Sequence, residues 1–268
     1  MPSSPFRRGF PAAPVAAKVP QITVLFWITK LVTTAMGEAA ADYLAGVSIV
    51  LAAVVGSAAF IAAMVLQFRC RSYRATVYWF AVAMVAVFGT MAADALHILF
   101  HISYLTSTIG CLLVLAAVFG WWSRSQRTLS IHSITTTRRE LFYWAAVLAS
   151  FAMGTAIGDL TATTFGLGFA GSVALFAVLI VVPAVGWWRW GWNAVASFWA
   201  SYVLTRPLGA SIADWLGKPA SFGHGLGLGD GPVALALTLL LIGLVGYQRR
   251  TGHGVQPTAV SERNASAA

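Results

Sequence analysis

Five acidic side chains lie inside stretches of sequence that are otherwise apolar, and they have the clearest capacity for chemistry. The chain of 268 residues has only eight acidic residues, and the five are Glu38, Asp42, Asp94, Asp159 and Asp214. Glu38 and Asp42 are four residues apart, so in a helix both carboxylates face one side. Two carboxylates this close in a low-dielectric setting share a proton or a cation. Their oxygens suit a hard divalent metal ion, and a proton relay suits them equally well.

Two basic residues, Lys30 and Arg206, lie in the same kind of apolar stretch. Lys30 is twelve residues from both Lys18 and Asp42, which places it near the middle of a membrane-crossing helix, too deep to reach water easily. We therefore predict that both bases are charge partners of the acids, through an Arg206–Glu38 pair or a pair between Lys30 and an acid. Five acids and two bases give a net charge of −3 when all are ionised, which favours cations.

Two histidines, His97 and His101, are four residues apart and follow Asp94. Imidazoles at this spacing on one helix face can bind a transition metal. However, His101 falls in the predicted loop, and the other apolar stretches have no equivalent pair. A His pair at the membrane interface is the simpler interpretation, and a metal site is the alternative.

The composition places these residues in a membrane. The chain is 59% hydrophobic and 9% charged, with a mean hydropathy of +0.78, whereas a soluble domain has about 25% charged residues. Eight apolar stretches are long enough to cross about 30 Å of hydrocarbon. The predicted fold is therefore all-α, a polytopic integral membrane protein with about eight transmembrane helices. The predicted spans are 22–43, 46–67, 75–97, 102–123, 140–161, 167–187, 193–215 and 230–248.

A sequence motif occurs four times, and each copy has a tryptophan, a glycine ten residues later and an aspartate five residues beyond it. Such self-similarity indicates internal duplication. The four copies are Trp27–Gly37–Asp42, Trp79–Gly89–Asp94, Trp144–Gly154–Asp159 and Trp199–Gly209–Asp214. The motif predicts four parallel two-helix repeats, related by an axis along the membrane normal. They occupy about 22–67, 75–123, 140–187 and 193–248 of a transmembrane domain over 21–250, with disordered cytoplasmic tails at 1–20 and 251–268.

Positive charge is distributed unevenly among the loops. Arginines occur before the first apolar stretch, after the eighth, and in every second loop between, while the alternate loops hold almost nothing positive beyond Lys218. Because positive loops stay in the cytoplasm, both termini are predicted to be cytoplasmic and the aspartates to lie near the outer edge of the hydrocarbon. The net charge of +9 reflects these loops, so we expect the lipid bilayer as a partner and no nucleic acid.

Three segments resemble a widespread bacterial family of uncharacterised membrane-anchored proteins. They are KVPQITVLFWITKLVTTAMGE (18–38), TLSIHSITTTRRELFYW (128–144) and TRPLGASIADWLGKP (205–219). The resemblance covers nearly all of 18–250. It implies the polytopic fold and a multi-pass location in the bacterial inner (cytoplasmic) membrane, and it implies no activity.

The residues favour a cation transporter, with a divalent metal such as manganese as the exported ion and the five acids as ligands or proton carriers. One alternative is a cation channel with an aspartate ring at its outer mouth. Another is a membrane scaffold or sensor that transports nothing. No nucleophile–base set or phosphate loop stands out, so an enzyme is not predicted. A bound divalent cation is the one candidate cofactor, and the oligomeric state stays open.

Overall fold

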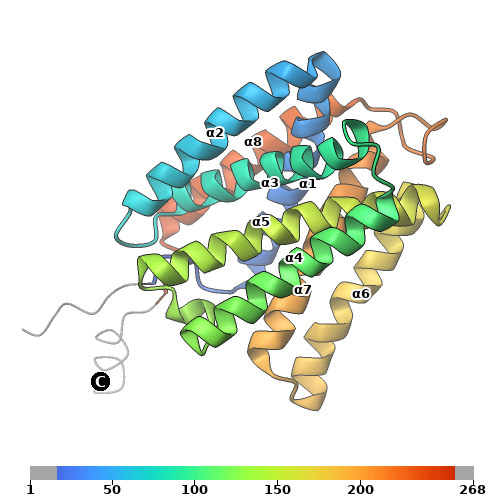
Figure 1. The fold of residues 1–268 in the computed structure, drawn as a ribbon. Coiled ribbons are helices and arrows are strands. Elements are labelled where there is room, and N and C mark those ends of the chain that lie inside the picture. Colours follow the sequence, from blue (N-terminus) through green and yellow to red (C-terminus); the bar gives the residue numbers. More distant parts are fainter. Residues whose placement is uncertain (1–16, 257–268) are drawn as a thin grey trace, which may run out of the picture.

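The computed structural model describes residues 17–256, and its regular structure in this range is entirely helical. Eight long helices follow one another along the chain (Figure 1). Because all of this regular structure is helical, the all-α prediction is confirmed. Each helix begins and ends within four residues of a predicted span. The α-helices are α1 (Val24–Val47), α2 (Ile49–Arg69), α3 (Ala75–Ile98), α4 (Tyr104–Gln126), α5 (Thr137–Asp159), α6 (Gly168–Trp190), α7 (Ala194–Gly217) and α8 (Asp230–Thr251). Two short helices are the 3₁₀ turn η1 (Ile131–Ser133) and the π-helix η2 (Leu160–Thr164).

Polar residues cap the start of five of the eight α-helices. The residue before α1, α2, α4, α5 and α7 has a side-chain oxygen that accepts a hydrogen bond from a backbone N–H of the first turn. This satisfies N–H groups that have no partner inside the helix. The five capping residues are Thr23, Ser48, Ser103, Thr136 and Asn193.

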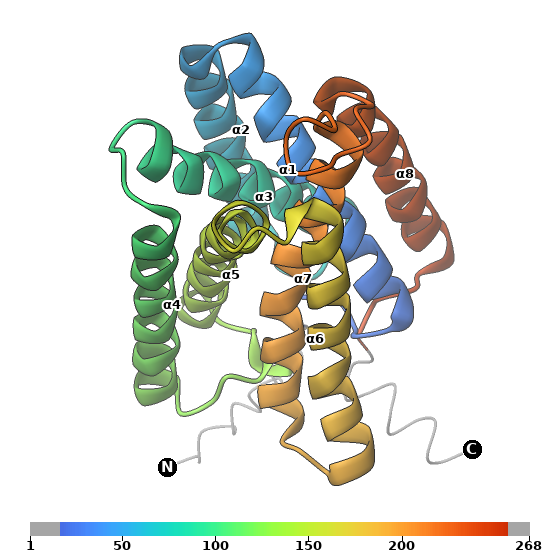
Figure 2. The same cartoon turned by 90° about the vertical axis from the view of Figure 1, so that its right-hand side faces the viewer.

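The odd-numbered helices form an inner ring. Contacts run from α1 to α3, from α3 to α5, from α5 to α7, and from α7 back to α1. Each even-numbered helix lies outside this ring and packs mainly against the odd helix of the next repeat: α2 on α3, α4 on α5, α6 on α7 and α8 on α1 (Figure 2). The four repeats therefore succeed one another around a common axis.

The repeated glycines allow this ring to close. At each of them an added Cβ would collide with the next inner helix, at the residue seven positions after that helix's repeated tryptophan. The contacts are Gly37 with Ala86, Gly89 with Phe151, Gly154 with Arg206, and Gly209 with Thr34. Small residues let helix backbones approach closely in membranes. The glycine of the repeat is thus a packing residue, and the fourth copy completes the circle by contacting the first.

Seven of the eight α-helices are long and apolar enough to cross a membrane, which indicates a multi-pass membrane protein. The exception is α7, which has the required length but carries Arg206 and Asp214, both buried. Less than a third of the membrane-length window is buried in each of the four even-numbered helices, α2, α4, α6 and α8. These outer helices therefore expose wide apolar surfaces of the kind that lipid covers.

The prediction of disordered tails over 1–20 and 251–268 is too broad. The N–H of Gln21 donates to the carbonyl of Gly254 at 2.8 Å, and the amide of Gln256 donates to the carbonyls of Val19 and Pro20. The start and the end of the described chain therefore lie together at one end of the bundle. Residues 1–16 and 257–268, which include the remainder of both predicted tails, lie outside the described residues.

Candidate functional site

Each inner helix has one stripe of side chains, formed by every fourth residue, that faces the other inner helices. Of these twenty residues, seventeen are buried, and the three that are partly exposed are all aspartates. The axis is therefore packed along its length except at the end where the repeated aspartates lie, which we call the aspartate end. The opposite end, with the arginine-rich loops, is the arginine end. The stripes are Phe26–Lys30–Thr34–Glu38–Asp42, Tyr78–Val82–Ala86–Thr90–Asp94, Tyr143–Val147–Phe151–Thr155–Asp159 and Phe198–Tyr202–Arg206–Ala210–Asp214.

An aromatic layer closes the axis at the arginine end. It consists of the residue directly before each repeated tryptophan: Phe26, Tyr78, Tyr143 and Phe198. All four are buried. The hydroxyls of Tyr78 and Tyr143 lie 2.5 Å apart, and the ring centroids of Phe26 and Phe198 lie 6.3 Å apart. These four buried aromatic side chains therefore occupy the axis at this level.

Glu38 and Arg206 form an ion pair at the centre of the bundle. Their charged atoms are 2.6 Å apart, and the side chains are 3% and 0% exposed. The hydroxyls of Thr90 and Thr155 donate to the same Glu38 oxygen, at 3.0 and 3.3 Å, and both also accept from Arg206. Each inner helix thus contributes one residue to the pair and its hydrogen bonds. The predicted Arg206–Glu38 pair is confirmed.

The remaining donors of the guanidinium reach backbone carbonyls. Nη1 donates to the carbonyl of Thr34 and Nε to that of Phe151, both at 3.3 Å. A charged group in the interior is stable only when its donors are satisfied. Arg206 therefore ties α7 to α1, α3 and α5 at one level of the axis.

Lys30 is buried, as predicted, but it does not pair with an acid. Its ammonium donates to the hydroxyl of Thr205 at 2.5 Å and lies 3.8 Å from the centre of the Tyr202 ring. No carboxylate in the described part of the chain forms an ion pair with it. The reason is depth, since Lys30 precedes Glu38 by two helical turns, or about 12 Å. The role of Lys30 as a carboxylate partner is therefore corrected to a cation–π contact.

Three carboxylates converge beyond the ion pair toward the aspartate end. One oxygen each from Glu38, Asp42 and Asp214 lies within 4.8 Å of the other two. Asp214 is 5% exposed, and its carboxylate has no hydrogen bond or ion pair with any other residue between 17 and 256. We call this set the three-carboxylate cluster. Several hard oxygens at this spacing are the ligands that a divalent cation such as Mn²⁺ or Mg²⁺ requires.

Lys218 neutralises part of this charge. Its ammonium lies 2.8 Å from Asp42 and 3.0 Å from Asp230, the first residue of α8. Burial lowers the pKa of Lys218, but the charges of Asp42 and Asp214 and the hydrogen bonds to Asp42 and Asp230 raise it more. The net result is a pKa above its ordinary value.

The other two predicted acids lie outside the three-carboxylate cluster. Asp94 and Asp159 are partly exposed at the aspartate end, close enough to the cluster to interact with its charge. Neither side chain has a hydrogen bond or ion pair within the described chain. Asp159 ends α5 where the backbone widens into the π-helix η2, a feature that is frequent at functional sites.

The alternative of a metal site at His97 and His101 does not fit the structure. Because α3 ends at Ile98, His101 is not on the helical face that the spacing requires. The ring of His97 stacks on Tyr104 with centroids 3.9 Å apart, and its Nδ1 lies 2.9 Å from the carbonyl of Ile102. His97 therefore fixes the turn between α3 and α4.

One buried ion pair in the described part of the chain escaped the sequence reasoning. Glu140, which is buried, forms an ion pair with Lys18 at 2.6 Å and accepts from the amide of Gln67 at 3.0 Å. The contact joins residues 122 positions apart, and nothing in the repeat motif marks it. It holds the N-terminal segment against the arginine end.

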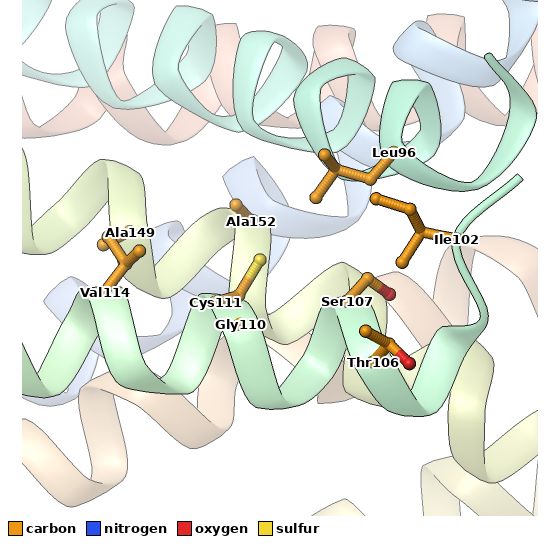
Figure 3. A pocket seen from close by; sticks show the side chains of 9 residues that line it. All are labelled: Leu96, Ile102, Thr106, Ser107, Gly110, Cys111, Val114, Ala149 and Ala152. Carbon is orange, nitrogen blue, oxygen red and sulfur yellow. The ribbon is translucent and has the colours of Figure 1, made fainter. Parts of the chain in front are cut away.

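A groove on the side of the bundle is separate from these charges. It has a volume of about 360 Å³ and lies between α3, α4 and α5 (Figure 3). Its lining is mostly apolar, with Leu96, Val114 and Ala152 among its residues, and contains no acid or base. Nothing in it points to the chemistry of the inner ring.

Fold and site together define a polytopic membrane protein in which four two-helix units surround a buried charged axis. The chain belongs to the family described as Repeat of Unknown Function (DUF347), whose model matches residues 25–73, 77–128, 142–191 and 197–253. Each match covers most of one odd helix and all of the even helix that follows, so the family's repeat is the two-helix unit and the predicted fourfold duplication is confirmed. No curated protein and no solved structure matches the chain.

Proposed function

We propose that this protein is a transporter of a cation and that the three-carboxylate cluster binds the transported ion. The observation that carries the proposal is Asp214, which is buried beside Glu38 and Asp42 and has no partner within residues 17–256. A buried acid is costly unless it is protonated or neutralised. A bound cation shared with Glu38 and Asp42 would neutralise it, and a carried proton would do the same.

In this proposal all eight α-helices cross a bacterial inner membrane. The 24 residues of α7 span about 36 Å at the helical rise, and their charged side chains face the inner ring rather than lipid. The arginine end would face the cytoplasm by the positive-inside rule. The aspartate end would then face outward, where Asp94 and Asp159 draw cations toward the cluster.

The ion that suits the cluster is a hard divalent metal such as manganese. Carboxylates and hydroxyls are hard ligands, which favour Mg²⁺, Ca²⁺ and Mn²⁺ over softer metals. Thr90 and Thr155, whose hydroxyls already hold Glu38, orient one of the three ligands.

The alternatives fit the geometry less well. A channel needs a continuous path, but the aromatic layer of Phe26, Tyr78, Tyr143 and Phe198 closes the axis at the arginine end. Alternating exposure of the cluster to the two sides fits a closed axis better. A scaffold would account for the Glu38–Arg206 pair but leaves the buried carboxylate of Asp214 without a purpose.

The test is metal flux. Cells with and without the protein are compared for their content of a panel of metal ions, and the ion that changes is then followed into liposomes containing purified protein. Asp42→Asn and Asp214→Asn should each lower the flux by about tenfold or more, because each removes over about 1.4 kcal/mol of ion binding. Asp94→Asn is the same chemical change outside the cluster and should mainly raise the concentration for half-maximal flux.

The variants must accumulate in the membrane and elute as the native protein does on size exclusion. If the double variant Asp42→Asn, Asp214→Asn moves every ion as fast as the native protein, the cation transporter is excluded.

A further inference from the structure

The loop between α7 and α8 holds Lys218 in a fixed place beside the three-carboxylate cluster. Lys218 directly follows α7, and its N–H donates to the carbonyl of Asp214 at 2.8 Å. Its own carbonyl accepts from the N–H of Gly227 at 2.8 Å. Gly225 packs so tightly against this carbonyl that a Cβ has no room. The backbone of Lys218 is therefore rigid, and only its long side chain is free to move.

The ammonium of Lys218 has two acceptors, and only one of them belongs to the cluster. Asp42, at 2.8 Å, is part of the three-carboxylate cluster, whereas Asp230, at 3.0 Å, is not. The second oxygen of Asp230, Oδ1, is buried and has no partner within the described chain. The ammonium can therefore leave Asp42 and keep a carboxylate partner at Asp230.

The net charge of the cluster depends on whether Lys218 is paired with Asp42 or with Asp230. With Lys218 on Asp42, the three acids, Arg206 and Lys218 together carry a charge of −1 when all are ionised. With Lys218 drawn to Asp230, the remaining four groups carry −2. One dication neutralises that charge, and one monovalent ion does not.

We infer that the transported ion is a dication that binds by displacing Lys218 from Asp42, and that Lys218 is the counter-ion which holds this carboxylate while no ion is bound. This inference rests on the proposed function, because it specifies how the same cluster takes its ion. It makes Lys218 a residue that sets the affinity of the site. A tethered competitor weakens binding, which allows an ion to be released after transport.

The experiment is equilibrium binding of Mn²⁺ to the purified protein in detergent, followed by the electron paramagnetic resonance signal of free Mn²⁺. Lys218→Gln removes the competitor and should tighten binding about tenfold, which corresponds to about 1.4 kcal/mol. Asp230→Asn removes the alternative partner and should weaken binding, since Lys218 then stays on Asp42. In the Lys218→Gln background, Asp230→Asn should lose most of its effect.

Arg189→Gln is the matched control, because it removes an exposed positive charge at the end of α6, beside the start of α7 and a helix length from the cluster. It should leave Mn²⁺ binding unchanged. Sodium at 1,000-fold excess over Mn²⁺ should not displace the metal from the native protein, because a monovalent ion leaves a charge of −1.

The inference is overturned if Lys218→Gln binds Mn²⁺ no more tightly than the native protein, or if sodium at 1,000-fold excess displaces the metal. Either result leaves the proposed function standing, because flux through liposomes is measured independently. If Lys218→Gln tightens Mn²⁺ binding and Asp230→Asn weakens it, a loss of folding is excluded as the common cause of the two effects.

Discussion

The carboxylate of Glu38 and the guanidinium of Arg206 lie 2.6 Å apart, although their residues are 168 positions apart in the chain. Glu38 lies on the first inner helix and Arg206 on the fourth. The contact therefore joins the first repeat to the fourth and closes the ring of inner helices. Both hydroxyls that support Glu38 come from the two intervening inner helices, α3 and α5.

Arg206→Ala should lower the free energy of unfolding by about 3–5 kcal/mol, because it leaves Glu38 buried and uncompensated. Adding Glu38→Gln should restore part of this loss, since a neutral amide can still accept from Thr90 and Thr155. The measurement is a double-mutant cycle on unfolding in detergent, with Arg249→Ala, an exposed arginine at the end of α8, as a control without effect. Additive losses would show that the two side chains are not coupled.

The packing of the repeated glycines leads to a second prediction. Gly37→Ala places a methyl group against the Cβ and the backbone of Ala86, which cannot move aside as the end of a flexible side chain would. Overpacking of this kind costs about 1–3 kcal/mol. Thermal unfolding in detergent should show this loss.

Gly46→Ala is the matched control on the same helix, because a Cβ there meets nothing within 4 Å. It should unfold no earlier than the native protein. Equal losses at Gly37 and Gly46 would contradict closure of the ring through the glycine.

The repeat motif predicted more of the site than composition did. Because the copies are parallel, positions counted from each tryptophan give depth, and Arg206 and Glu38 differ by only four such positions. Their similar depth favoured this pairing, which also requires that α1 and α7 lie side by side. Depth also explains why Lys30, two turns away, is not a partner of Glu38.

The order of helices around the axis was not predictable. No local pattern says that the fourth repeat returns to the first, and that contact is what brings Asp214 to Asp42 and Glu38. The pairing of Lys218 with Asp42 depends on the same closure and on a loop with little periodicity. The ion pair of Glu140 with Lys18 depends on how the N-terminal segment folds under the bundle, which the apolar pattern does not encode.

The last prediction concerns orientation, and it follows from the arginines. Cys70 lies in the arginine-rich loop between α2 and α3 and is half-buried. Since positive loops remain in the cytoplasm, an impermeant thiol reagent added outside intact cells should not label Cys70 in a Cys111→Ala background. Ser221→Cys, in the exposed loop after Lys218, should be labelled under the same conditions in a chain without the two native cysteines. Labelling of Cys70 together with protection of the introduced cysteine would show that the arginine end faces outward, and the aspartates would then receive their ion from the cytoplasm.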